Sequence, residues 1–113
     1  MILKELDEQP IKNELHMDDG TIILAMTVQK AGTFIPQHSH PYSHTSYIAA
    51  GAVSVWKNEA WLGDFHAPAG LLIEANTQHL FKALRDNTTV LCIHQKALLK
   101  INDEPHFVTY EET

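Results

Sequence analysis

Histidine is the residue type whose number and spacing in this sequence could do chemistry. The chain holds 8 histidines among 113 residues. His38, His40 and His44 lie in one short segment and share the same parity. Successive side chains of a β-strand point to opposite faces, so a strand continuing through Pro41 would project all three rings from one face. Imidazole is the commonest side-chain ligand for divalent transition metals, and rings placed in this way could converge on one ion.

The same spacing also fits an exposed strand end that happens to be rich in histidine. Spacing alone does not separate these two interpretations, and the surroundings of the segment must decide between them. Among the other histidines, His66 lies in a predicted loop, where we expect it to be solvated, and His16 and His106 lie outside the segment.

The elements that position these rings are predicted to be short β-strands. Segments rich in β-branched and apolar residues are separated by turn signals about every 8–12 residues, which is typical of an all-β sandwich or barrel. We expect turns at Asn58–Glu59, Gly63–Asp64, Asn76–Thr77 and 85–87. The predicted strands cover residues 21–29, 33–40, 45–50, 52–57, 60–62, 70–74, 79–84 and 88–94.

Length, charge and cysteine content narrow the class of protein. A chain of 113 residues corresponds to one domain. Its formal net charge of −6 argues against nucleic acid or an anionic membrane as the main partner. Cys92 is the single cysteine, so the chain can form neither an internal disulfide nor a thiolate zinc cluster. The sequence has no signal-peptide pattern and no run of 18 apolar residues. We therefore expect a cytoplasmic protein.

The histidine segment resembles the first sequence motif of the cupin superfamily. That motif runs from a glycine through five residues to His-x-His, then through three or four residues to a glutamate, and then through six residues to a second glycine. Gly32, His38, His40 and Gly51 occupy these positions with the expected gaps. The departure is His44, which stands where most members of the family carry glutamate.

A second, more divergent segment resembles the other cupin motif. Gly63–Asp64 resembles its start, and residues 73–81 resemble its end, where the family has Pro-x-Gly-x-x-His. Here Glu74 and Asn76 replace the proline and the glycine, and His79 supplies the histidine. Asparagine tolerates the positive φ that such a turn position favours.

The resemblance implies an all-β fold, the double-stranded β-helix that forms a small jelly-roll barrel. We expect a single cupin-like domain over residues 1–113, with the motif-bearing core at about 20–95 and a C-terminal arm over 96–113. The resemblance further implies a metal site inside the barrel, and a small subgroup of cupins holds its divalent ion with histidines only. The ligands carried over to this sequence are His38, His40, His44 and His79.

A four-histidine set would change the charge of the site. Three histidines and a glutamate leave a divalent ion at +1, whereas four neutral imidazoles leave it at +2, which favours anionic oxygen ligands. The sequence does not choose among Mn, Fe, Ni, Cu and Zn. No catalytic residue is evident, because no carboxylate stands near the ligand set as a general base. Residues expected to line the site are Met26, Tyr47, Phe81, Cys92 and His94.

Three functions remain open from the sequence. The first is a metal-dependent enzyme, such as a dioxygenase, isomerase or lyase, that acts on a small oxygen-rich or anionic molecule. The second is a non-catalytic protein of bacterial or phage origin that binds a metal or a small ligand. The third is a purely structural role, in which the metal only stabilises the fold. We also expect a homodimer, because open sheet edges invite pairing and because Trp56 or Trp61 could anchor the contact.

Overall fold

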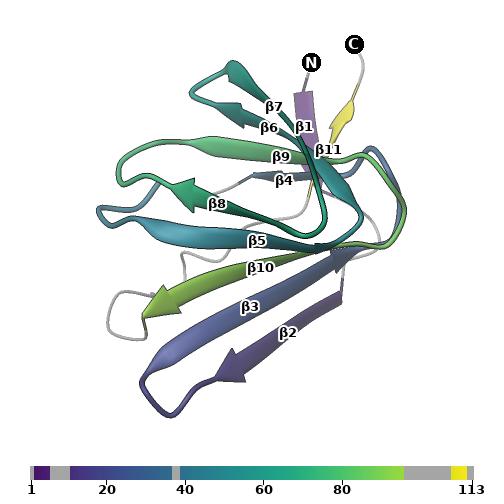
Figure 1. Ribbon diagram of the computed structural model, residues 1–113. Coiled ribbons are helices and arrows are strands. Elements are labelled where there is room, and N and C mark those ends of the chain that lie inside the picture. Colours follow the sequence, from purple (N-terminus) through teal and green to yellow (C-terminus); the bar gives the residue numbers. More distant parts are fainter. Residues whose placement is uncertain (1, 6–10, 37–38, 96–107, 112–113) are drawn as a thin grey trace.

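The computed structural model describes residues 2–5, 11–36, 39–95 and 108–111, and within them every regular element is a β-strand (Figure 1). All strand pairs are antiparallel. The strands are β1 (Ile2–Glu5), β2 (Ile11–His16), β3 (Thr21–Val28), β4 (Phe34–Pro36), β5 (His44–Ala50), β6 (Ala52–Lys57), β7 (Ala60–His66), β8 (Ala69–Ile73), β9 (His79–Ala83), β10 (Thr88–Gln95) and β11 (Val108–Glu111).

The strands form two sheets that face each other. The six-stranded sheet has the order β1-β11-β4-β9-β6-β7, and the five-stranded sheet has the order β2-β3-β10-β5-β8. In Figure 1, β2, β3 and β10 lie at the bottom, and β6 and β7 lie at the top. The expected all-β jelly-roll fold is confirmed.

The alternation of buried and exposed side chains shows which face of each strand lines the interior. In β3, Ile22, Leu24, Met26 and Val28 are buried, whereas the residues between them are half-buried. Burying such side chains contributes about 1.5–3 kcal/mol each, so this period-2 pattern fixes the register of the strand. The interior cluster is completed from the other strands by Ile35, Ile48, Val53, Val55, Ile73, Phe81, Ala83, Val90 and Cys92.

Two of the predicted turns adopt the backbone that their sequence favours. Asn58 and Glu59 both have positive φ, 47° and 72°, as a two-residue hairpin turn between β6 and β7 requires. Asn76 has a φ of 59° in the turn before β9. The hairpin places Trp56 directly opposite Trp61, as expected for a cross-strand pair.

The predicted turn at Gly63–Asp64 is wrong. β7 continues through both residues to His66, and the chain reverses only at Ala67–Pro68. Gly63 has a φ of 138°, and the β6–β7 register shifts just across from it, between Val55 and Trp56. Glycine in this strand therefore accommodates a bulge instead of ending the strand.

The chain ends form parts of the same sheets. β1 pairs with β11, and Val108 of β11 pairs with Phe34 of β4. The C-terminal segment, expected to be an arm, thus contributes a strand to the six-stranded sheet. β2 was not predicted, because it is an edge strand with every side chain exposed and shows no alternation of burial. Within the described residues, no helix is long and apolar enough to cross a membrane.

Candidate metal centre

Buried histidines gather at one end of the two facing sheets. Along β5 the inward residues are His44, Ser46 and Ile48, so the strand begins polar and becomes apolar. Along β10 the order is reversed, because Cys92 and His94 follow the apolar Val90. Since β5 and β10 are antiparallel, both polar ends meet at the same end of the barrel. The sheet topology therefore builds a histidine-rich end onto an apolar core.

His44 and His94 lie next to each other at this end. Ile93 pairs with Thr45, so the next step of the β5–β10 register brings His94 across from His44. Their ring centroids are 4.6 Å apart, and the rings are inclined by 30°. Both residues are almost fully buried. His94 was expected from the sequence only as a lining residue, and the structure puts it in contact with a predicted ligand.

His40 reaches the same place from a loop. The predicted continuous strand over residues 33–40 is wrong, because β4 ends at Pro36 in one sheet and β5 begins at His44 in the other. The chain crosses between the sheets here, so strand parity does not bring the rings together. The His40 ring nevertheless lies 5.6 Å from that of His44 and 6.0 Å from that of His94. Tyr42 stacks on His40 at 4.9 Å.

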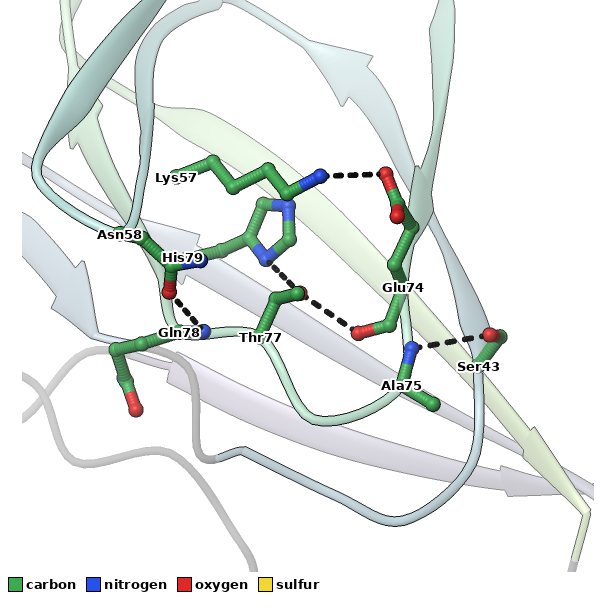
Figure 2. Close-up of polar contacts among 8 residues, drawn as sticks. All are labelled: Ser43, Lys57, Asn58, Glu74, Ala75, Thr77, Gln78 and His79. Atoms are coloured by element: carbon green, nitrogen blue, oxygen red, sulfur yellow. Dashed lines mark hydrogen bonds and ion pairs between the residues drawn. The ribbon is translucent and has the colours of Figure 1, made fainter.

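A backbone hydrogen bond ties the His40 loop to the turn that precedes His79. The amide of Asn76 donates to the carbonyl of His40 at 2.6 Å. Nearby, the amide of Ala75 donates to Oγ of Ser43 at 3.0 Å (Figure 2). The two segments that carry the predicted ligands are therefore joined directly, although one precedes β5 and the other precedes β9.

The two contacts of the Thr77 hydroxyl indicate which nitrogen of His79 carries the proton. The hydroxyl of Thr77 donates its single hydrogen to the carbonyl of Glu74 at 2.7 Å. The same oxygen lies 3.3 Å from Nδ1 of His79 and can only accept there, so Nδ1 carries the proton (Figure 2). Nε2 of this ring is then left with its lone pair. Metal-ligating histidines typically have such a hydrogen bond on the other ring nitrogen, because it sets the tautomer and orients the ring.

Burial keeps the imidazoles of His44 and His79 neutral. Burial, together with the neighbouring His94, His40 and His79, lowers the pKa of His44 from 6.5 to about 4. Burial and then the positive charge of Lys57 lower the pKa of His79. Neither ring nitrogen of His44 has a hydrogen-bond partner among the described residues. A buried polar atom without a partner costs about 1–3 kcal/mol, and a bound cation would remove that cost at the unprotonated nitrogen.

The donor set therefore fits a divalent transition metal in its chemistry. Neutral imidazoles with available lone pairs, held in a buried place, are suitable ligands. In the part of the chain that the structure describes, no three histidine, cysteine or carboxylate side chains stand in positions that would hold an ion. His38, the remaining predicted ligand, lies outside the described residues. The four-histidine set thus stays a prediction.

The predicted lining residues divide into two groups. Met26, Phe81 and Cys92 are fully buried in the interior cluster. Burial raises the pKa of the Cys92 thiol to about 11, so this sulfur stays protonated and packs as core beside Ser46. Tyr47 is different, because it points to the outer face of β5 and is 37% exposed. Tyr47, which was expected to line the site, therefore lies on the outer face instead, and Tyr42 is the tyrosine that contacts the histidines.

One charged residue of the site was missed from the sequence. Lys57 pairs with His79 in the β6–β9 register, so both side chains leave the same face of the six-stranded sheet. Its ammonium lies 2.7 Å from Oε1 of Glu74. The signal was present, because Lys57 has the same parity as the buried Val53 and Val55 in a predicted strand.

Comparison with known proteins supports the fold and leaves the family open. No protein-family model matches the chain, and no curated protein sequence matches it either. Among solved structures, KdgF from Halomonas sp. is 10% identical with a TM-score of 0.65, covering 99% of this chain and 89% of that one. An RmlC-like cupin from Desulfovibrio desulfuricans is 22% identical with a TM-score of 0.63, covering 80% and 86%.

A third similar structure is the S161A mutant of Bacillus subtilis oxalate decarboxylase OxdC. It is 14% identical with a TM-score of 0.69, and the match covers 90% of this chain and 29% of that longer one. Together with the two facing antiparallel sheets, these likenesses define the class: the chain has the cupin fold.

Proposed function

We propose that this cupin-fold chain binds one divalent transition metal through His38, His40, His44 and His79. The observation that carries the proposal is the state of His44, whose two ring nitrogens are buried without a hydrogen-bond partner among the described residues. The low pKa of this ring, about 4, keeps it neutral at physiological pH, as ligation demands.

The ligand of the site is, in this proposal, a small anionic or oxygen-rich molecule. When bound, the metal would supply Lewis-acid chemistry at a +2 charge that no carboxylate ligand offsets. The interior below the histidines is apolar, with Phe81, Met26 and Ile73 fully buried there. Apolar surroundings without water strengthen the electrostatic attraction between the metal and an anion at the polar end. Such a site suits a dioxygenase, isomerase or lyase.

A non-catalytic metal or small-ligand binder of bacterial or phage origin is the second candidate. The observation that favours it is the absence, among the described residues around the histidines, of a buried carboxylate that could act as general base. The coordination of the metal separates both candidates from a purely structural metal. A catalytic site keeps an exchangeable water, whereas a structural site is closed by its ligands.

Elemental analysis of the purified protein tests the metal site. We expect about one equivalent of a divalent transition metal in the native chain, and its loss from His40→Ala and His79→Ala. His66→Ala is the matched control, because His66 is an exposed histidine at the end of β7. Circular dichroism verifies that each variant folds. A full equivalent retained by the double variant would refute the ligand assignment.

We also propose that the chain is a cytoplasmic homodimer. Among the described strands, β1 and β7 border one sheet, and β2 and β8 border the other. Unpaired edges are places where a second copy can add its own strand. Trp61 on β7 is 61% exposed and Leu62 is 49% exposed, which places apolar surface at one of these edges.

A further inference from the structure

An inward-facing lysine is the feature of the site that the proposed metal set does not use. Lys57 ends β6 and pairs with His79 of β9, as Val55 pairs with Phe81 and Val53 with Ala83. The partners in this row are buried, so Lys57 is the charged member of an otherwise interior face. An ammonium at this position is placed to pair with a carboxylate.

Glu74 supplies that carboxylate from the turn after β8. Its Oε1 accepts from Nζ of Lys57 at 2.7 Å, and Figure 2 shows the ammonium reaching past the imidazole of His79 toward this carboxylate. The charges of Lys57 and Glu74 therefore meet next to the His79 imidazole (Figure 2). The electrostatic coupling agrees with this geometry, because the charge of Lys57 lowers the pKa of His79 and that of Glu74.

The ion pair is weak enough for a ligand to replace. The side chain of Glu74 is 55% exposed and that of Lys57 is 30% exposed. An exposed pair of this kind is worth about 0–1 kcal/mol, because water competes for both charges. If Glu74 turns outward, it is solvated at little cost. The Lys57 side chain still leaves the sheet on the same face as His79, because the two backbones are paired in the β6–β9 ladder.

We propose that Lys57 is the carboxylate-recognition residue of this site and that Glu74 occupies its ammonium until an anionic ligand displaces it. The ligand class is a small carboxylic acid whose carboxylate takes the place of the Glu74 carboxylate. This inference rests on the proposed function, since it adds a second contact for the anion that the histidine-held ion would attract. Two contact points select dicarboxylates over monocarboxylates.

The test is a titration of malonate into the native chain, Lys57→Met and Glu74→Gln, followed by NMR of the Thr77, Gln78 and His79 amides. Each protein is studied zinc-loaded and metal-free, and zinc content is measured separately. We expect Lys57→Met to weaken malonate about tenfold and Glu74→Gln to tighten it several-fold, since the internal competitor is gone. The control Lys82→Met removes a lysine from β9 whose ammonium lies over Phe34, 5.5 Å from the ring centroid.

The two proposals fail in different ways. If zinc does not bind, the metal site is refuted, and if zinc-loaded and metal-free proteins bind malonate equally, the part of the metal in anion binding is refuted. In both cases the Lys57 and Glu74 contrasts still stand. If Lys57→Met binds malonate like the native chain, or Glu74→Gln binds it no more tightly, the recognition role of Lys57 is overturned. Failure of the native chain and Glu74→Gln to bind malonate at tens of millimolar overturns it as well.

Discussion

The His94 ring lies beside the His44 ring at a centroid distance of 4.6 Å and an inclination of 30°, although the two residues come from the ends of different strands, β10 and β5. Each ring displaces water from around the other. A positive charge on one ring would also repel a positive charge on the other. The contact therefore favours neutral imidazoles. It makes protonation of His44 unfavourable at this end of the barrel.

The stability of the metal-free protein should depend on pH through His44. Its pKa is about 4 in the folded chain against an ordinary value of 6.5. Between these values the unfolded chain binds more protons, so stability rises as pH increases from about 4 and is complete above about 6.5. We expect a loss of about 1–2 kcal/mol at the acid end.

Urea denaturation of chelator-treated protein across this pH range measures the effect. His44→Gln should flatten the profile in the acid range, because glutamine does not titrate. His66→Gln, at an exposed position, is the control and should leave the profile unchanged. A native profile that is already flat between pH 4 and 6.5 would contradict the burial argument.

Replacing His44 by glutamate should weaken anion binding at the metal. The change restores the ligand type common in cupins and lowers the charge of the site by one. With equal metal loading, we expect oxalate to bind His44→Glu less tightly by about 1–2 kcal/mol, or about tenfold. Calorimetric titration of oxalate into both proteins gives the comparison. Equal affinities would mean that the fourth ligand's charge does not govern what the site accepts.

The homodimer should depend on the exposed edge at β7. Light scattering is expected to give close to twice the chain mass of 12.7 kDa at micromolar concentration. Trp61→Glu places a charge on this edge and should shift the protein toward monomer. Leu72→Glu is the control, because Leu72 is 64% exposed on β8 of the other sheet. A native chain that scatters as a monomer would reject the dimer.

Gly51, which follows β5, should tolerate no side chain. Its φ is +77°, and an added Cβ would lie 2.9 Å from Cα of Thr88 and collide with the Thr88 hydroxyl. We expect Gly51→Ala to cost about 2–5 kcal/mol in the free energy of unfolding, from backbone strain and overpacking together. Gly32, with a φ of +92° and open space around it, provides the comparison.

Gly32→Ala should cost only the strain, about 1–2 kcal/mol. Denaturant melts of both variants separate the two contributions. Equal losses at the two glycines would show that the contact with Thr88 relaxes, so that only the backbone conformation matters at Gly51.

The sequence alone determined the fold class and most of the strands. Alternation of apolar residues in 21–28, and turn pairs such as Asn58–Glu59, act locally, so they can be recognised without knowing what packs against them. The resemblance of Gly32, His38, His40 and Gly51 to the first cupin motif likewise implied the cupin fold. β2 was not predicted, because its side chains are all exposed and show no alternation of buried and exposed residues.

The arrangement of the candidate site was decided only by the tertiary structure. Strand parity was the wrong reason for grouping the histidines, because the chain crosses from one sheet to the other between β4 and β5. Register between distant strands brought His94 to His44 and Lys57 to His79. Such pairings depend on which strands become neighbours, and that is set by burial of the whole core. The local sequence does not indicate which strands become neighbours. The contacts between these histidines and Lys57 therefore form only once both sheets are in place.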